Sequence, residues 1–222
     1  MHISDGVLPV SVAVGAYALS AAVTAISVKK AKGDDLPKLA VVTASFFVAS
    51  LLYVPLGPTS VHLLIPGLVG ILLGSSAFIA IGLGLTLQCL LFQYGGLTAL
   101  GANSLMMGIP AVIAGWMFQV IKGETISRHV FAGAVAGGLG TGLAAIILGF
   151  LLFLGGEDFL GVAKLALAAH IPVMIVEAAV AAFTVSFLFK VKPDLLGCVF
   201  AMPIMPEELQ ESVENTPMYE TS

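Results

Sequence analysis

The sequence predicts an all-α membrane protein, a bundle of seven transmembrane helices. Of its 222 residues, 59% are hydrophobic and only 10% are charged, and the mean hydropathy is +1.07. A soluble domain carries roughly 25% charged residues, and a small core cannot bury so many apolar side chains. The charges are also unevenly placed, because residues 39–121 contain no Asp, Glu, Lys or Arg. Since a helix needs ~20 mostly apolar residues to cross a bilayer, that run alone holds several spans.

Apolar runs separated by Gly, Pro and charged residues divide the chain into seven candidate spans. They are residues 9–28, 38–54, 62–76, 78–94, 103–121, 129–154 and 161–189. The boundary between the third and fourth spans depends only on Gly74-Ser75-Ser76 and on length. We therefore expect an N-terminal segment (1–8), a transmembrane domain (9–195) and a solvated acidic tail (196–222) that is rich in Glu.

Lysine and arginine indicate which side of the membrane each loop faces, because they are enriched in cytoplasmic loops. With the N-terminus outside, loops 29–37 and 122–128 and the stretch after residue 189 face the cytoplasm. Of the basic residues, only Lys164 then lies outside. The cytoplasmic ones are Lys29, Lys30, Lys32, Lys38, Lys122, Arg128, Lys190 and Lys192. The sequence thus predicts an outside N-terminus and a cytoplasmic C-terminus.

Charge and cysteine content exclude several classes of protein. The net charge of −4 and the lack of a large basic cluster argue against nucleic-acid binding. Cys89 and Cys198 lie far apart in apolar surroundings, so neither a disulfide nor a cysteine metal site is expected. The first five residues carry no Lys or Arg, so a cleavable signal peptide is not expected either.

Two histidines are predicted on the outer side, His2 in the N-terminal segment and His62 at the outer end of the third span. Taken singly, each fits an interfacial histidine bonded to the backbone. Together with Met1 they offer four nitrogen donors: the Met1 amine, the His2 backbone nitrogen, the His2 Nδ1 and the His62 imidazole. The first three close a five- and a six-membered ring around one ion. Ionising the amide nitrogen needs a strongly binding metal such as Ni(II) or Cu(II), which favour square-planar nitrogen coordination.

Further polar residues lie in or near the predicted spans. His170 and Glu177 are seven residues apart in the seventh span and so share a helix face. They form either an ion or proton path or a buried pair that fixes helix packing. His129 is expected at the cytoplasmic interface. The Gly-rich turn from Gln93 to Asn103 either holds the N-terminal segment in place or is a simple loop.

Four parts of the sequence resemble the CbiM/NikM family of substrate-capture components. They are MHISDG (1–6), GPTSVHL (57–63), LFQYGGLTALGAN (91–103) and the HIP…E pattern (170–177). The resemblance extends to about residue 190. It implies a seven-helix membrane subunit that takes Ni(II) or Co(II) from outside, with Met1, His2 and His62 as ligands. Residues that match the family in supporting positions are Asp5, Ser60, Gln93 and Asn103.

The resemblance also implies partners. Members of this family work with a transmembrane coupling subunit and two cytoplasmic ATPases of an energy-coupling factor transporter, often with a small accessory membrane protein. The sequence has no G-x-x-x-x-G-K-[ST] phosphate loop, so the chain is not expected to be the ATPase or an enzyme. We expect a transported Ni(II) or Co(II) ion, with nickel slightly favoured by square-planar chemistry, and no organic cofactor.

Three other functions remain open from the residues alone. A secondary metal/proton exchanger would use His170 and Glu177 as its ion path. An intramembrane enzyme would use the same pair as acid and base, although the chain offers no convincing nucleophile beside them. A purely structural membrane subunit would bind no divalent ion.

Overall fold

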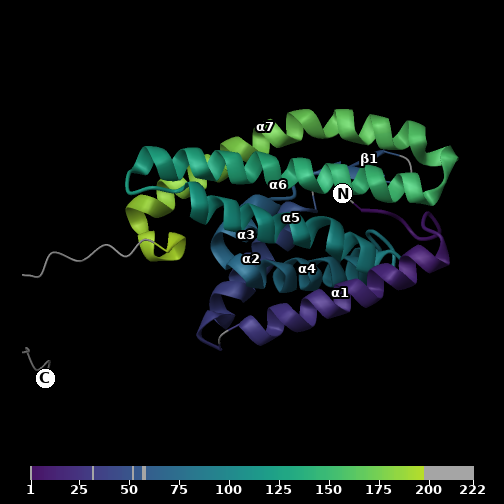
Figure 1. Cartoon of the computed structure of the whole chain (residues 1–222), viewed down its shortest axis with the longest axis horizontal. Coiled ribbons are helices and arrows are strands. Elements are labelled where there is room, and N and C mark those ends of the chain that lie inside the picture. Colours follow the sequence, from purple (N-terminus) through teal and green to yellow (C-terminus); the bar gives the residue numbers. More distant parts are fainter. Residues whose placement is uncertain (1, 32, 52, 57–58, 198–222) are drawn as a thin grey trace, which may run out of the picture.

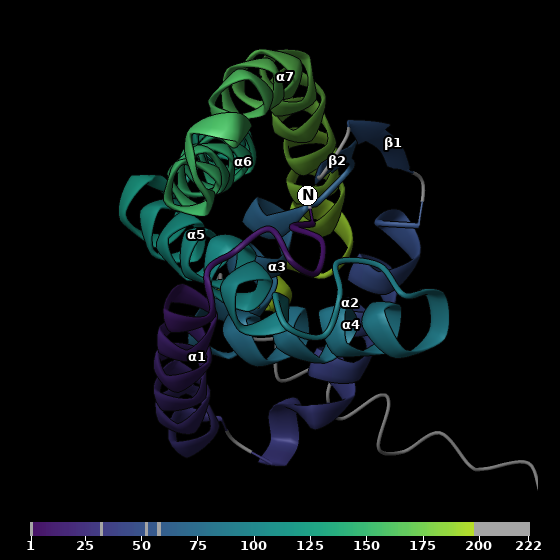
Figure 2. The same cartoon turned by 90° about the vertical axis from the view of Figure 1, so that its right-hand side faces the viewer.

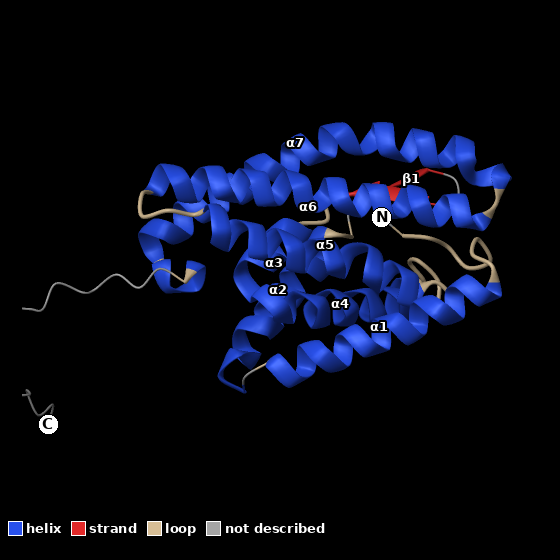
Figure 3. Ribbon diagram, viewed as in Figure 1, coloured by secondary structure: helices blue, strands red, loops and turns tan. Residues whose placement is uncertain are grey.

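The computed structural model describes residues 2–31, 33–51, 53–56 and 59–197 of the chain. Within them the structure is helical apart from one antiparallel β-hairpin (Figure 3). The helices are α1 (Val10–Lys30), α2 (Leu36–Ala49), α3 (Pro66–Leu73), α4 (Ala77–Phe92), α5 (Leu100–Ile121), α6 (Ile126–Gly155) and α7 (Leu160–Val191). The hairpin strands are β1 (Tyr53–Leu56) and β2 (Thr59–His62), and short 3₁₀ turns occupy Gly33–Asp35, Gly74–Ser76, Glu157–Phe159 and Pro193–Leu196.

Five stretches of the described chain are long and apolar enough to cross a membrane. They are α1, α5, α6, α7 and the stretch Pro66–Phe92, which contains both α3 and α4. Their outward faces carry large apolar side chains, such as Phe183 in α7, which is 75% exposed. Exposure of this kind in water would be costly, and it is expected where the solvent is lipid. The chain is therefore a multi-pass membrane protein.

The predicted second and third spans differ from the structure. Helix α2 ends at Ala49 and not at residue 54, α3 begins at Pro66 and not at residue 62, and the hairpin occupies the predicted loop 55–61 together with the adjoining span ends. The reason is local, since Pro55 and Val61 suit a turn-flanked strand and not a helix interior. Hydropathy counts cannot distinguish an apolar strand from an apolar helix. Helix α3 has only eight residues, and Gly74, at φ 54°, ends it.

The long helices α5, α6 and α7 run in alternating directions along the bundle (Figure 1). In α6, for example, Gly133 lies against Val185 of α7, and further along Gly149 lies against Leu167, so these two helices are antiparallel. The alternation collects four segments at one end of the bundle, here called the N-terminal end. These are residues 2–9, the hairpin, the 93–99 loop and the 156–159 turn. The end of α7 lies at the opposite end.

Helix α5 is the central element and contacts α1, α3, α4 and α6. Short helix α3 fits between α5 and α6 because both contacts are made at glycine. A Cβ at Gly70 would lie 1.8 Å from the Ala111 carbonyl oxygen of α5, and one at Gly67 would lie 2.4 Å from the Ala136 carbonyl oxygen of α6. Such close backbone contact between small residues is typical of membrane helices.

Candidate metal centre

The N-terminal segment folds back from the start of α1 into the bundle (Figure 1). Seen from the N-terminal end of the bundle, it crosses between α5 and the hairpin (Figure 2). His2 is only 6% exposed, and Ile3 is fully buried. The pKa of the His2 imidazole lies well below its usual value, mainly because of burial and secondly because of the positive charge at the chain start. The ring is therefore neutral at neutral pH, which is the form that binds metals.

Asn103 fixes the residue that follows His2. The Ile3 N–H donates to Asn103 Oδ1 at 2.8 Å, and Asn103 Nδ2 donates to the Ile3 carbonyl at 3.1 Å. The same Nδ2 donates to the Gly95 carbonyl at 3.3 Å. Asn103 is 1% exposed at the start of α5, so these bonds form in a place where water cannot replace them. One amide thus joins the N-terminal segment to the 93–99 loop.

Two glycines of that loop lie directly against the N-terminal segment. A Cβ at Gly95 would lie 3.2 Å from His2 Nδ1, and one at Gly96 would lie 2.3 Å from the Asp5 carboxyl carbon. Both glycines have positive φ, 81° and 74°, a conformation that other residues rarely adopt. Side chains at these positions would push His2 and Asp5 out of place.

Asp5 binds the same loop. Its Oδ1 accepts hydrogen bonds from the Thr98 hydroxyl and from the Thr98 N–H, the latter at 2.7 Å. These bonds, the hydroxyl one first, hold the pKa of the Asp5 carboxyl below its usual value. The Tyr17 hydroxyl donates to the Leu97 carbonyl and so ties the loop to α1.

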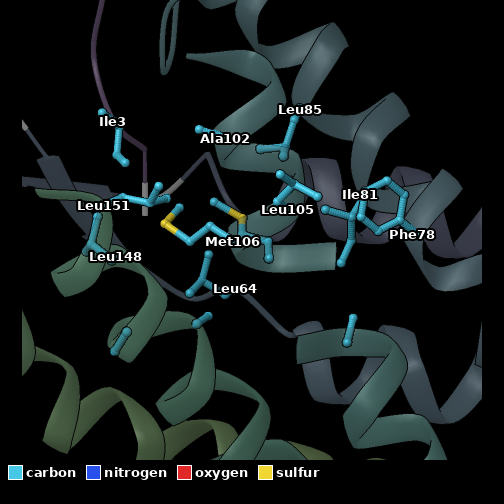
Figure 4. Packing of buried hydrophobic residues seen from close by; sticks show 14 of the residues in the cluster. Ile3, Leu64, Phe78, Ile81, Leu85, Ala102, Leu105, Met106, Leu148 and Leu151 are labelled. Carbon is cyan, nitrogen blue, oxygen red and sulfur yellow. The ribbon is translucent and has the colours of Figure 1, made fainter. Parts of the chain in front are cut away.

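The segment that carries His62 meets the N-terminal segment in the core. The hairpin register pairs His62 with Tyr53, while the His62 and Ser60 side chains, like the whole of Met1, lie outside the described residues. Leu64, two residues after His62, is fully buried in the same cluster as Ile3 (Figure 4). Met106 and Leu148 belong to that cluster as well. Ile3, next to His2, and Leu64, two residues after His62, thus belong to the same hydrophobic core cluster.

Glu177 and His170 are both buried on α7, at 2% and 0% exposure. Glu177 Oε1 accepts hydrogen bonds from the N–H groups of Leu64, at 2.5 Å, and Ile65, at 2.8 Å. His170 Nδ1 lies 2.6 Å from the Ala166 carbonyl, and its Nε2 has no hydrogen-bond partner within the described ranges. No hydrogen bond between the two side chains is found there either. They share a face, as the sequence predicts, but each has its own contacts.

Two further residues singled out in the sequence, Gln93 and His129, lie apart from these contacts. Gln93 ends α4 in the left-handed conformation, at φ 58°, with an exposed side chain. His129 lies in the first turn of α6, where its ring contacts Phe118 and Phe189 at the end opposite His2, and it is only 2% exposed. Sequence reasoning missed the contact of Thr98 with Asp5 and that of Glu177 with residues 64 and 65. No sequence signal indicates the second pair, because more than a hundred residues separate its members.

Side chains alone do not form a metal site in the described part of the chain. No group of three or more His, Cys, Asp or Glu side chains lies close enough there to hold an ion. The described contacts hold the N-terminal segment in place, with His2, Ile3 and Val7 buried.

The fold and these contacts define a multi-pass helical membrane protein whose N-terminal segment is built into its core. Residues 2–195 match the family described as "cobalt uptake substrate-specific transmembrane region", CbiM. The chain belongs to the CbiM family.

Similar proteins agree with this assignment. A putative metal transport protein of Haemophilus influenzae is 34% identical over 200 residues, covering 89% of this chain and 97% of that protein. A putative fused nickel transport protein, NikMN, of Archaeoglobus fulgidus is 37% identical over 208 residues, covering 88% and 68%. The solved structure of a transition metal transporter superimposes with a TM-score of 0.76 at 28% identity, covering 86% of this chain and 93% of that one.

Proposed function

We propose that this chain captures Ni(II) or Co(II) at the N-terminal end of the bundle for uptake into the cell. The observation that supports this most strongly is the fold-back of residues 2–9. It buries His2 and puts Ile3 in the same core cluster as Leu64, two residues after His62. Burying the polar imidazole of His2 in this way is costly unless it finds partners, and a bound ion would be such a partner.

The proposed donors are the Met1 amine, the His2 backbone nitrogen, the His2 Nδ1 and the His62 imidazole. Four nitrogens in one plane suit Ni(II), which gives nickel a slight preference over cobalt. The lowered pKa of the His2 imidazole supports this donor set, because no proton has to leave that ring at neutral pH. Asn103, Asp5 and the 93–99 loop would keep the donor segment in place.

The distribution of basic residues supports an external position for this site. The described lysines and arginine that were assigned to the cytoplasm belong to the end opposite His2. They are Lys29, Lys30, Lys38, Lys122, Arg128, Lys190 and Lys192. Lys164, near the start of α7, belongs to the N-terminal end. By the positive-inside rule the N-terminal end faces outward and the C-terminus faces the cytoplasm. In this orientation we propose seven membrane crossings, with α3, whose eight residues span only about 12 Å, crossing together with the chain that leads into it.

Uptake against a gradient needs an energy source that this sequence does not supply. The chain lacks a phosphate loop. We propose that it works with a transmembrane coupling subunit and two cytoplasmic ATPases. A small accessory membrane protein completes the complex. The relative named as a fused protein, NikMN, supports this, because this chain covers only 68% of its length. Release of the ion inward would follow from a conformational change imposed by these partners.

Metal titration of histidine variants tests the proposed site. Purified protein with a native N-terminus is titrated with Ni(II) and Co(II), beside the variants His2→Ala, His62→Ala and His129→Ala. We expect metal affinity to fall roughly 100-fold or more in the first two variants. Removing a ligand should cost more than removing a residue that only hydrogen-bonds to a ligand, which typically costs about 10- to 100-fold. His129→Ala is the matched control, because this histidine lies at the opposite end. Unchanged binding in the His2 and His62 variants would refute the proposal.

A further inference from the structure

Glu177 makes an unusual contact for a carboxylate in a membrane helix. It is 2% exposed in the middle of α7, and one oxygen, Oε1, accepts two backbone hydrogen bonds. The donors are the N–H groups of Leu64, at 2.5 Å, and Ile65, at 2.8 Å. A carboxylate at this depth is expensive and normally serves a purpose. Here it holds a turn of another part of the chain.

That turn is difficult for the chain to form unaided. Ile65 has φ 46° and ψ 30°, a left-handed conformation that β-branched residues avoid. Pro66 follows directly, and no side chain of its own segment caps α3. The two N–H groups before the helix are buried, so they need an acceptor from elsewhere. Glu177 supplies it through Oε1, which accepts from both N–H groups.

The same turn determines where β2 ends. Leu64 is two residues after His62, so at most about 7 Å of chain separates the anchored N–H from the histidine. Strand β2 also contacts α7. On the other side the hairpin register holds His62 opposite Tyr53. The backbone of His62 is thus fixed from both directions, once by β1 and once by Glu177.

We propose that Glu177 is the positioning residue for the His62 imidazole in the metal site. The proposal rests on the function proposed above. The arrangement is the same as in the N-terminal segment, where Asn103 holds Ile3, the residue after His2. Each histidine is followed by backbone that is held by one buried polar side chain, Asn103 from α5 or Glu177 from α7. Glu177 acts through the backbone and does not bind the ion itself.

Nickel binding to Glu177→Leu and Glu177→Gln tests this role. The leucine variant keeps an apolar side chain of similar size but leaves both N–H groups without their acceptor, and we expect nickel affinity to fall about 10- to 100-fold. The glutamine variant keeps an acceptor oxygen and should recover most of that loss. Thr184→Val is the matched control, because it removes the bond from Thr184 to Val180 on the same helix and should leave affinity unchanged.

A double-variant comparison separates positioning from a general structural role. If Glu177 acts through His62, adding Glu177→Leu to His62→Ala causes little further loss of nickel affinity. Independent, additive losses would overturn the proposal, as would wild-type affinity in Glu177→Leu or an equal loss in Thr184→Val. Where Glu177→Leu does not fold, the same comparison is made with Glu177→Ala, which also lacks an acceptor.

Failure of the proposed function gives a different result. If the wild-type protein has no tight site for either Ni(II) or Co(II), all variants bind equally poorly, and both proposals fall. If wild type binds tightly and His62→Ala does not, only the Glu177 role is under test. Hydrogen exchange at the Leu64 and Ile65 amides of metal-free protein then checks the contact itself. Fast exchange in Glu177→Leu but slow exchange in wild type and Thr184→Val is the expected result, and equal exchange in all three would overturn the proposal.

Discussion

Replacing Asn103 by alanine should release the N-terminal segment from its buried position. Asn103 makes two hydrogen bonds to Ile3, at 2.8 and 3.1 Å. A buried hydrogen bond contributes about 1 kcal/mol net, and a buried group that is left unpaired costs about 1–3 kcal/mol. The variant therefore weakens docking of the segment by about 2–4 kcal/mol. Since 1.4 kcal/mol corresponds to a tenfold change, nickel affinity should fall by about 30- to 1000-fold.

The assay is nickel titration of purified protein, with Ser104→Ala as the control. Ser104 is the next residue of α5 and is also buried, but its hydroxyl donates to the Leu100 carbonyl within the same helix and not to the N-terminal segment as far as the structure describes it. Its loss should leave nickel affinity nearly unchanged. Wild-type affinity in Asn103→Ala, or an equal loss in Ser104→Ala, would refute the idea that Asn103 holds the donor segment.

Two further predictions concern the 93–99 loop. Gly95→Ala should weaken nickel binding in the same titration, because its φ is 81° and a Cβ would lie 3.2 Å from His2 Nδ1; Gly82→Ala, with open space around it, should not. Hydrogen bonds from Thr98 lower the pKa of the Asp5 carboxyl in the folded protein. The stability that these bonds give is therefore fully present above the pKa of the unfolded chain, about 3.9, and is lost as the pH falls through the lower pKa of the folded protein. Thermal unfolding of metal-free protein between pH 6 and pH 3 should therefore show a smaller loss of stability in Asp5→Asn than in wild type, and equal losses would contradict the assignment.

The sequence was sufficient for the membrane class and for most helix positions. The uncharged run 39–121 and the glycines and prolines between apolar runs are features of local composition, which is enough to place long apolar helices. Helices α5, α6 and α7 follow the predicted spans closely. The hairpin was not predicted. Pro55 and Val61 argue against a helix there, but that β1 and β2 pair with each other, Tyr53 opposite His62, is a property of the three-dimensional structure that hydropathy and spacing do not carry.

Part of the candidate site was accessible to the same reasoning and part was not. His2, Asp5 and Asn103 stand out because polar residues are rare in this chain. In the structure Asp5 of the N-terminal segment bonds to Thr98 of the 93–99 loop, and Asn103 bonds to Ile3. The partner of Glu177 could not be identified, because its carboxylate binds main-chain N–H groups that every residue possesses. The left-handed turn at Ile65 decides which N–H groups are available to donate to Glu177, and no residue type in the sequence predicts that turn.

The central claim is that the metal ion is bound through the first amine of the chain together with His2. The most direct test inserts one alanine between Met1 and His2, which keeps every side chain but breaks the five- and six-membered chelate rings. A control insertion between Lys30 and Ala31, at the opposite end of the bundle, leaves the segment intact. We predict that the first insertion abolishes tight nickel binding and the square-planar absorption band, and that the second preserves both. Tight binding with an unchanged band after the first insertion would contradict the account.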